Sequence, residues 1–546
     1  ENGFSKNRLP HFFDAEGPSM VRSLTFDERR LLSKPLHSKN QVLLFDHSRL
    51  RRSATFVSKW KLETKDDSTL QDVLYRKHFA IIEANARPII PAYSGVLNFD
   101  NHSAKPSIVK DKAVIVIDSF STGAVLAHEI YLQGYKVICL FSDGKNDSIN
   151  RLPEGLSRIF STILTLQRLE DDNLAFEQLT ANISQLPWPV VAVMAGAETG
   201  VELADKLSSH LGLRTNGVQL SEARRNKYIM GETIRKAGIR AVKQLKASTW
   251  IEISDFIKEW NPIPFQVVLK PVESAGSEDV ILCHDISEVQ AAYGRIMGKV
   301  NGLGLLNQAV LVQEYLEGQE YVIDMVSRDG IHKAVAIWEC DRREINHASF
   351  ILHGLRLVSS EEVNQKLGSS TFEQLINYQK SVLTALGILN GPSHGELKWC
   401  RGEPVLVEVG ARCHGGEGTW VDVANHVYGY NQVSAAAAAF LEPEEFFNVP
   451  DKPIHQIDHG RLLCIVSKVS GYLKEINADF IEEIRRMRSF IRMEIFLKPG
   501  EIVKKTIDCF TLAGVIMLSH RYESQVENDY LRIREMEDLD LFKCEE

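Results

Sequence analysis

Two glutamates on either side of a short turn are the residues of this sequence best suited to chemistry. The stretch "HGELKWCRGEPVLVEVGAR", residues 394–412, has two apolar-alternating segments around an Arg-Gly-Glu-Pro turn. If the hairpin is centred on Gly402, antiparallel pairing places Glu396 directly opposite Glu408. Facing like charges are destabilising unless a hard cation such as Mg²⁺ lies between the carboxylates. The pair therefore indicates a divalent metal site, and an exposed hairpin with solvated acids is the alternative.

The same hairpin carries a histidine and an arginine at its open end. His394 precedes Glu396 by two residues, so the two side chains share one face of a strand. His394 could contact a substrate or deprotonate an attacking amine, or it could be a packed histidine behind the glutamate. Arg412 continues the face beyond Glu408, where a guanidinium could bind a phosphoryl group.

A lysine before a loop of small residues forms a second candidate site, in "FQVVLKPVESAGSEDV" at residues 265–280. An apolar strand delivers Lys270, and Ser274, Ala275 and Gly276 follow within the loop. Small residues let backbone N–H groups approach phosphate oxygens, and the lysine adds a positive charge. The spacing does not fit the GxxxxGK pattern of a P-loop, and an ordinary turn is the alternative.

A third candidate is the bend in "AVLVQEYLEGQEYVIDMV", residues 309–326. The strand runs through Gln313 and Glu314 to Leu316, turns, and continues as a new strand that begins near Glu320. Such a bend can offer adenine alternating backbone donors and acceptors, and Glu320 could bind the ribose hydroxyls. The alternative is a hairpin-like bend with charged edges.

The elements that must position these residues are clearest from residue 112 onward. "KAVIVID" reads as a buried strand, "AVLAHEIYLQG" as a helix and "YKVICLFSD" as a second strand, which predicts a doubly wound domain at 112–212. "SFSTGA" lies where such folds bind ligands, but its single glycine is weak evidence for a dinucleotide site. A mixture of strands and amphipathic helices follows at 213–450, and residues 451–546 are strand-rich with a charged helical end.

Composition narrows the functional class. The chain has 546 residues, 44% of them hydrophobic, and a net charge of -9, which argues against nucleic acid as a partner. Eight cysteines without CxxC pairs fit a reducing compartment, the cytoplasm or an organelle lumen. No apolar run approaches the roughly 20 residues that span a bilayer. The chain begins at Glu1 rather than Met, which leaves open whether a targeting segment has been removed.

The order of these motifs resembles that of the ATP-grasp superfamily of ligases. Lys227, in "NKYIMGETIRKAG", comes first, and Lys270 with its loop, the bend, the two glutamates and the arginine follow in turn. "VIDSFSTGAVLAHEIYLQGY", "GPSHGELKW", "VEVGARCHGGEG" and "FLKPGEIVKKTIDCFTLAGVIMLSH" are most similar to the L-amino acid ligases, which make dipeptides. The resemblance covers residues 112–546.

The resemblance implies an α/β and α+β multidomain fold. Its parts would be a Rossmann-like pre-ATP-grasp domain at 112–212, a two-subdomain ATP-grasp domain at 213–450 with its lid at about 245–315, and a C-terminal ligase domain at 451–546. Residues 1–111, charged and irregular, would be an accessory region.

The resemblance also implies roles for individual residues. Lys227 and Lys270 would contact the ATP phosphates, and Ser274, Ala275 and Gly276 would form the lid loop. Gln313, Glu314 and Leu316 would hold adenine, and Glu320 the ribose. Glu396 and Glu408 would bind Mg²⁺ or Mn²⁺, and Arg412 would stabilise the acyl phosphate and the tetrahedral intermediate. The chain departs from many members at Gly410, where they have asparagine, so one metal ion would have fewer protein ligands.

The implied activity is ATP-dependent joining of an amino acid or similar small carboxylate to an amine through an acyl phosphate. ADP and phosphate are released, and the superfamily often forms homodimers. An ATP-grasp enzyme with a bicarbonate or thiol nucleophile, and a non-catalytic ATP-binding regulator, are the alternatives. In "CDRREINHASF", Asn346 lies in a region that resembles a phosphate and substrate contact, whereas Arg342 and Arg343 could equally be a solvated pair.

Overall fold

The computed structural model describes residue 106 and residues 108–545, except 145–147, 168, 170, 275, 303–304, 454–455 and 540. Most of the accessory region predicted at 1–111 therefore lies outside the described residues.

A four-stranded parallel sheet with the order β3-β2-β1-β4 begins the described chain. The five residues of β1 are all buried and apolar, as expected of a strand covered on both faces. Its strands are β1 (Ala113–Ile117), β2 (Lys136–Phe141), β3 (Phe160–Thr165) and β4 (Val190–Ala195), and its helices are α2 (Thr122–Leu132), α3 (Asp172–Ser184) and α4 (Val201–His210). The predicted Rossmann-like arrangement is confirmed.

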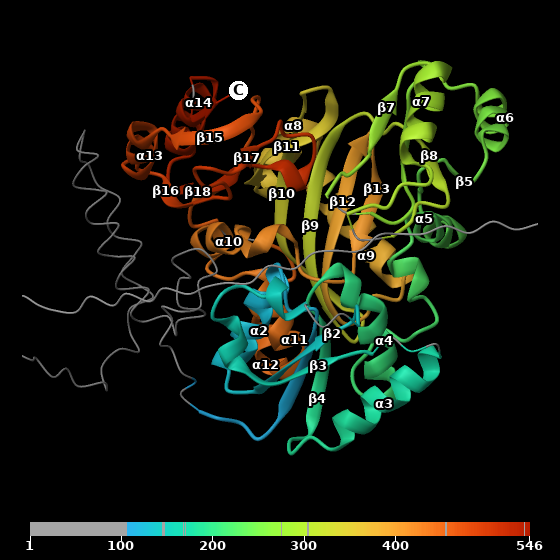
Figure 1. The fold of residues 1–546 in the computed structure, drawn as a ribbon, viewed down its shortest axis with the longest axis vertical. Helices are drawn as coiled ribbons and strands as arrows, with labels where there is room; N and C mark the ends of the chain where they lie inside the picture. Colours follow the sequence, from blue (N-terminus) through green and yellow to red (C-terminus); the bar gives the residue numbers. More distant parts are fainter. Residues whose placement is uncertain are drawn as a thin grey trace, which may run out of the picture. The chain divides into compact units, whose positions relative to one another are not determined.

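The largest sheet has eight strands in the order β13-β12-β9-β10-β11-β14-β18-β16, all antiparallel. Figure 1 shows its long strands β9, β10 and β12 side by side. The strands are β9 (Gln319–Arg328), β10 (Ile331–Ile345), β11 (Ala348–Leu357), β12 (Gly391–Cys400), β13 (Glu403–Gly410), β14 (His459–Ile465), β16 (Phe490–Ile495) and β18 (Gly514–His520). The sheet crosses the domain boundary predicted at residue 450, and the domain boundaries themselves stay predictions.

The β12–β13 hairpin contains a two-residue turn and a bulge. Arg401 and Gly402 have φ angles of 53° and 87°, which is the type I′ geometry of the tightest hairpins. Cys400 pairs with Glu403 and Leu397 with Leu406, but Glu396 pairs with Glu408, so Val407 is the extra residue. The bulge brings the two glutamates opposite each other.

A separate four-stranded sheet, β5-β8-β6-β7, occupies the region predicted as the lid. Its strands are β5 (Gln244–Ala247), β6 (Val267–Pro271), β7 (Ile281–Cys283) and β8 (Val310–Glu314), and it is preceded by α5 (Lys227–Lys236). Its helices are α6 (Trp250–Trp260) and α7 (Ile286–Ile296). Helix α6 begins with a capping box between Thr249 and Glu252, which satisfies its first free N–H groups.

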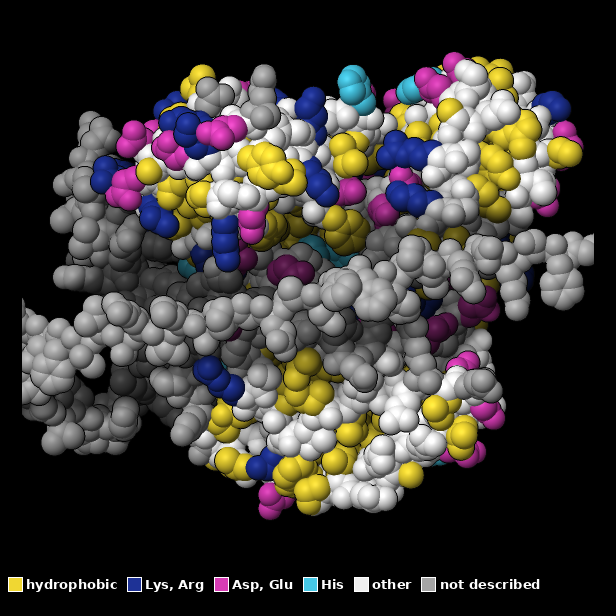
Figure 2. Space-filling model, viewed as in Figure 1, with side chains coloured by type: hydrophobic (Ala, Val, Ile, Leu, Met, Phe, Trp, Pro, Cys, Tyr) yellow, Lys and Arg dark blue, Asp and Glu magenta, His cyan; other side chains and the backbone are white. Residues whose placement is uncertain are grey.

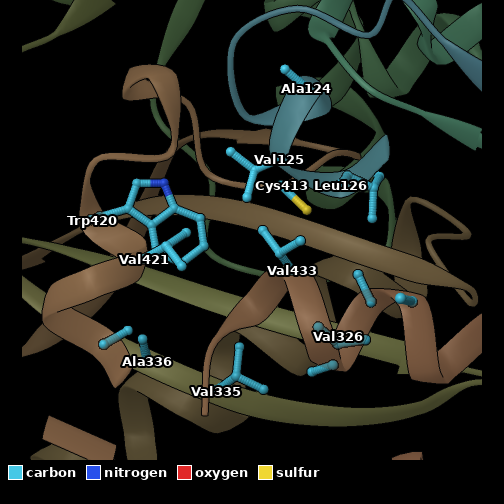
Figure 3. Packing of buried hydrophobic residues seen from close by; sticks show 14 of the residues in the cluster. Ala124, Val125, Leu126, Val326, Val335, Ala336, Cys413, Trp420, Val421 and Val433 are labelled. Carbon is cyan, nitrogen blue, oxygen red and sulfur yellow. The ribbon is translucent and has the colours of Figure 1, made fainter. Parts of the chain in front are cut away.

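A hydrophobic core joins the first sheet to the large one. Trp420, Cys413 and Val433 pack with Val125 of α2 and Val326 of β9 (Figure 3). The core also includes helices α10 (Trp420–Tyr428) and α11 (Gln432–Leu441). Gly418 lies close to α2, because an added Cβ would be 2.7 Å from Cγ2 of Val125. The loop of residues 412–420 is therefore packed against both α2 and the large sheet.

The remaining elements complete the C-terminal part and the outer face of the large sheet. They are α8 (Ser360–Leu367), α9 (Thr371–Ala385), α12 (Pro443–Asn448), α13 (Ala478–Arg485), α14 (Glu523–Asp538), β15 (Gly471–Ile476), β17 (Ile502–Val503) and β19 (Phe542–Glu545). Among the described residues, no helix combines the length and apolar character needed to cross a membrane. On the face in Figure 2, acidic and basic side chains of the described residues are interspersed.

Candidate active site

A cavity of about 800 Å³ lies between the two sheets and the lid. Twelve residues that were predicted as site residues line it: Lys227, Lys270, Ser274, Gly276, Gln313, Glu314, Leu316, Glu320, His394, Glu396, Glu408 and Arg412. Ala275 lies outside the described residues. The structure therefore brings together residues from motifs more than 180 positions apart in the sequence.

One face of the large sheet forms the floor of the cavity. Because side chains alternate along a strand, β12 presents His394, Glu396 and Lys398 on the same face. In the ladder with β9, Lys398 pairs with Glu320 and His394 pairs with Asp324. The floor therefore places a basic residue of β12 opposite an acidic residue of β9 at two positions, on either side of Glu396.

Two cations already neutralise the opposed glutamates. The Nζ atom of Lys227 lies 3.0 Å from Oε2 of Glu408, and Nη2 of Arg342 lies 3.5 Å from Oε2 of Glu396. Burial alone would raise the pKa of Glu396, but His394 and Arg342 outweigh it and hold this pKa well below its usual range. Glu396 is thus ionised, as a metal ligand must be.

Arg342 is partly buried between two acids rather than solvated. Its Nε atom donates to Oε1 of Glu320 at 2.6 Å, and Nη1 donates to Oγ of Ser277 and to the carbonyl of Phe350, both at 3.3 Å. Arg343, by contrast, is half exposed and pairs with Asp341. Of the two arginines, only Arg342 lines the cavity.

The lid supplies a second lysine from β6. Burial lowers the pKa of Lys270 to about 8, opposed by Glu408 and reinforced by Lys227. Lys227 also donates to the carbonyl of Ser274 at 2.7 Å, so the first lysine holds the loop that follows the second. The ammonium group of Lys227 therefore anchors the loop that follows Lys270 in the sequence.

The bend at residues 313–316 lines the cavity, but its polar side chains are held within the protein. Gln313 donates from Nε2 to Oε1 of Gln244 at 2.9 Å, and Glu314 pairs with Arg240 at 2.8 Å. Tyr315 and Leu316 of the bend also line the cavity.

Arg412 is held by a residue from the other sheet. Glu198, just after β4, lies 3.0 Å from Nε of Arg412 and 2.9 Å from Nη1 of Arg225. Burial alone would raise the pKa of Glu198, but Arg412 and Arg225 outweigh it and lower this pKa. An added Cβ on Gly410 would be 2.8 Å from Oε2 of Glu198, so the glycine makes room for this ion pair.

Behind Glu396 lies a buried carboxylate with two imidazoles. Asp324 is fully buried and lies 3.0 Å from Nδ1 of His394 and 3.0 Å from Nδ1 of His414. Trp338 donates its indole N–H to the same carboxylate at 2.8 Å. Asp324, His394 and His414 also place their ligand atoms close enough together to hold a metal ion, but their hydrogen bonds account for the arrangement.

Burial alone would lower the pKa of His394, but Asp324 and Glu396 outweigh it and raise this pKa to about 9. His394 therefore carries a proton at neutral pH between two carboxylates. Burial lowers the pKa of His414, opposed by Asp324 and reinforced by the charges of His394 and Arg412. The two neighbouring imidazoles thus differ in charge.

The opposite wall comes from the strand-to-helix loop after β1. Ser121 has a φ of 53°, a strained conformation of the kind found at ligand sites. Its Oγ accepts from the N–H of Glu417 at 3.2 Å, and Thr122 donates to the carbonyl of Gly415 at 3.0 Å. The "SFSTGA" segment therefore meets the residue 412–420 loop directly.

Several residues of the site were missed from the sequence. Glu198 lies directly after a buried strand of the first sheet, a position that could have indicated it. Asp324 is an acid within the apolar segment "YVIDMV", which is a signal for a buried partner. Asn346 was expected near phosphate and substrate, but its amide donates to the carbonyls of Ser467 and Thr506, at 3.0 and 2.9 Å.

Comparisons with known proteins agree with this geometry. A family model described as "ATP-grasp domain" matches residues 263–420. Dapdiamide A synthase from Enterobacter agglomerans is 30% identical over 436 residues, which are 79% of this chain and 97% of that protein. A solved L-amino acid ligase from Bacillus licheniformis has 19% identity, covers 79% of this chain and 98% of its own, and superposes with a TM-score of 0.60.

An ADP complex of N5-carboxyaminoimidazole ribonucleotide synthetase also shares the fold, with 16% identity and a TM-score of 0.54. The match covers 79% of this chain and 98% of that protein. The chain belongs to the ATP-grasp superfamily, and within it to the ligases that include dapdiamide A synthase and the L-amino acid ligases. The protein is an ATP-dependent, ADP-forming ligase that makes carbon–nitrogen bonds.

Proposed function

We propose that this ligase activates the carboxylate of an amino acid or similar small acid with ATP and joins it to an amine. The observation that carries the proposal is the opposed pair Glu396 and Glu408 on the floor of one cavity with Lys227, Lys270 and Arg412. A carboxylate and a triphosphate repel each other, and this concentration of cations offsets that repulsion.

ATP would lie between the lid and the floor. Lys227 and Lys270 would contact its phosphates, and Ser274 and Gly276 of the lid loop would cover them. Adenine would meet Leu316 and the backbone of the bend at Gln313 and Glu314, and Glu320 would bind the ribose. Support comes from the shared cavity and from the nucleotide complex of a structural neighbour.

Glu396 and Glu408 fit a hard divalent cation, Mg²⁺ or Mn²⁺. Their side chains come from directly opposed residues, they line the cavity together, and Glu396 is ionised. The cation would supply charge compensation for the phosphates. Gly410 adds no side-chain oxygen, and Glu198 fills the space beside it.

The reaction would proceed in two steps within the closed cavity. The substrate carboxylate attacks the terminal phosphorus, which gives an acyl phosphate and ADP. The amine then attacks the acyl carbon, so that a C–N bond forms and phosphate leaves with the electrons of the broken C–O bond. Arg412 would stabilise the negative charge that develops on the carbonyl oxygen. His394, protonated between Asp324 and Glu396, would hold Glu396 in place.

The test is ADP release by the protein in ATP, Mg²⁺ and a mixed pool of amino acids, with mass spectrometry of the products. Amine-dependent ADP release and a condensed product are expected, while release triggered only by a thiol or by bicarbonate would assign a different nucleophile. Release of ADP without any acceptor, or no turnover, would contradict the proposal.

Variants connect the activity to the site. Glu396→Gln and Arg412→Ala should each abolish amine-dependent phosphate release. Glu403→Gln is the matched control, because Glu403 is an exposed acid on the other strand of the same hairpin, paired with Arg240 at 3.0 Å. Turnover near the wild-type rate in either of the first two variants would overturn the site assignment.

A further inference from the structure

His414 is the imidazole of the cavity whose second nitrogen has no partner in the described structure. Its Nδ1 lies 3.0 Å from Asp324, and no hydrogen bond of the described residues involves its Nε2. His394 differs, because its Nε2 lies 3.5 Å from Oε1 of Glu396. Both side chains line the cavity. Both ring nitrogens of His394 therefore lie near a carboxylate, whereas only Nδ1 of His414 does.

The tautomer of His414 follows from its partner. An ionised carboxylate accepts hydrogen bonds and donates none. Burial alone would raise the pKa of Asp324, but the charges and hydrogen bonds of His414 and His394 outweigh it and hold this pKa well below its usual range. Nδ1 of His414 must therefore carry the proton, which leaves the lone pair on Nε2. This is how an aspartate orients a histidine for proton transfer.

The position of the ring is fixed on every side. It stacks on Trp420 with centroids 5.3 Å apart and meets Trp338 edge-on at 6.0 Å. The backbone N–H of His414 donates to Oε1 of Gln432 at 2.7 Å, and Gln432 in turn donates to the carbonyl of Ser393 on β12. A side chain held in this way cannot swing out of the cavity without breaking several contacts.

His414 also lies in the half of the cavity that faces the first sheet, where the proposed function would bring the amine. It is two residues beyond Arg412, and its loop contacts Ser121 and Thr122 of the wall opposite the lid. The half proposed to hold the nucleotide includes Lys270 on β6 of the lid. A base in this half would act on the second substrate and not on ATP.

We propose that Nε2 of His414 accepts the proton of the attacking amine, and that Asp324 is the positioning residue that holds this imidazole in its accepting tautomer. The inference rests on the proposed function, because it assigns a residue to its second step. As the C–N bond forms, one N–H proton moves to Nε2 of His414, the C–O bond to phosphate breaks, and phosphate leaves with the electron pair. The proton then returns to solvent.

The charged groups around His414 favour its neutral form. Burial lowers its pKa, the negative charge of Asp324 on β9 opposes this, and the positive charges of His394 on β12 and Arg412 after β13 reinforce it. Trp338 on β10 and Trp420 on α10 bring no charge. His414 can therefore accept a proton at neutral pH without first losing one.

The experiment compares two acceptors for the same acyl phosphate. Hydroxylamine is largely uncharged at neutral pH and needs little help from a base, whereas an amino acid amine is an ammonium ion. His414→Gln should keep ATP- and carboxylate-dependent hydroxamate formation within a few-fold of wild type. Amide formation at pH 7 should fall about 100-fold or more, and should recover as pH rises because more free amine is present.

Asp324→Asn should lower amide formation more than hydroxamate formation, because an amide at this position can favour the wrong tautomer of His414. Hydroxamate formation should fall as well, because Asp324 also holds His394 and, through it, Glu396. His332→Gln is the matched control: His332 is a buried histidine on β10, paired with Ser327 at 2.7 Å outside the cavity. If His414→Gln does not fold, as judged by thermal unfolding, His414→Asn with both acceptors decides.

Equal losses of hydroxamate and amide, or an unchanged pH profile of amide formation, would overturn the inference and leave His414 as a packing residue. A wild-type protein that forms hydroxamate but no amide with any amine would instead contradict the proposed function, and the inference would fall with it. The two failures are distinguishable, because the first concerns the variants and the second the wild type.

Discussion

Arg342 and Glu320 form a charge-assisted hydrogen bond inside the cavity, with 2.6 Å between Nε and Oε1. The side chains are only 16% and 7% exposed, so the pair is shielded from solvent. The same guanidinium approaches Glu396 at 3.5 Å. Arg342 therefore joins the proposed ribose ligand to a proposed metal ligand, and its removal would leave two acids without their shared counter-charge.

Arg342→Ala should weaken both the fold and ATP binding. Removal of one member of a buried ion pair costs about 3–5 kcal/mol of stability. The uncompensated acids should also repel the triphosphate, and a tenfold loss of ATP affinity corresponds to about 1.4 kcal/mol. Thermal unfolding and calorimetric titration with ATP measure the two effects. Arg343→Ala, which removes the half-exposed neighbour, is the control, and similar values for both variants would contradict the assignment.

ATP affinity should fall as pH rises above about 8. Burial lowers the pKa of Lys270 to about 8, so the free protein loses this ammonium charge above that pH. Bound phosphates favour the protonated lysine, and binding must then take up a proton, which becomes less favourable as pH rises. Titrations at pH 7 and 9 measure the change.

In Lys270→Met this pH dependence should disappear, and affinity at pH 7 should already be low. Lys246→Met is the matched control, because Lys246 is an exposed lysine on β5 of the same sheet. A wild-type affinity that stays constant between pH 7 and 9 would show that Lys270 does not contact the phosphates.

The smallest residue of the hairpin face gives a third prediction. In Gly410→Ala the new Cβ would lie 2.8 Å from Oε2 of Glu198 and 3.1 Å from Cζ of Arg412, so the ion pair must shift. Crowding of this kind costs about 1–3 kcal/mol, and a similar rise in the activation barrier would lower kcat roughly tenfold or more. The measurement is steady-state kinetics with the best amine.

The effect should depend on Glu198. In a Glu198→Ala background the carboxylate is absent, so Gly410→Ala should add much less to the loss already caused by Glu198→Ala. Gly294→Ala in α7, where an added Cβ meets nothing within 4 Å, controls for a general effect of alanine. Additive losses would mean that Glu198 and Gly410 act independently.

The predicted pairing of Glu396 with Glu408 is correct, although the predicted turn centre is not. The turn is centred between Arg401 and Gly402 and not on Gly402 itself. The extra residue at the bulge, Val407, restores the predicted pairing of the two glutamates. Turn residues can be identified from sequence, but a bulge depends on which strand face the core and the ligand require. The sequence therefore predicted the β12–β13 pairing correctly at the two glutamates but not next to the turn.

Fold class, family and the ordered motifs could be predicted because each is a local pattern. Glu198, Asp324 and His414 could not be placed, because their importance arises from contacts between separate elements. Asp324 meets His414 across 90 positions of sequence, and Glu198 meets Arg412 from a different sheet. A lone acid or histidine in an apolar segment indicates a buried partner without identifying it.

Asn346 illustrates the same limit and gives the last prediction. Its amide donates to two carbonyls of the C-terminal part, those of Ser467 and Thr506, and its φ of 51° is one that asparagine tolerates. Asn346→Gly keeps this backbone conformation but removes both hydrogen bonds, each worth about 0.5–1.5 kcal/mol. The protein should therefore unfold at a lower temperature, while KM for ATP and for the amine stays unchanged. His347→Gly, at the exposed neighbour with a φ of 64°, is the control for the added flexibility. A raised KM with unaltered thermal unfolding would return Asn346 to the role of a substrate contact.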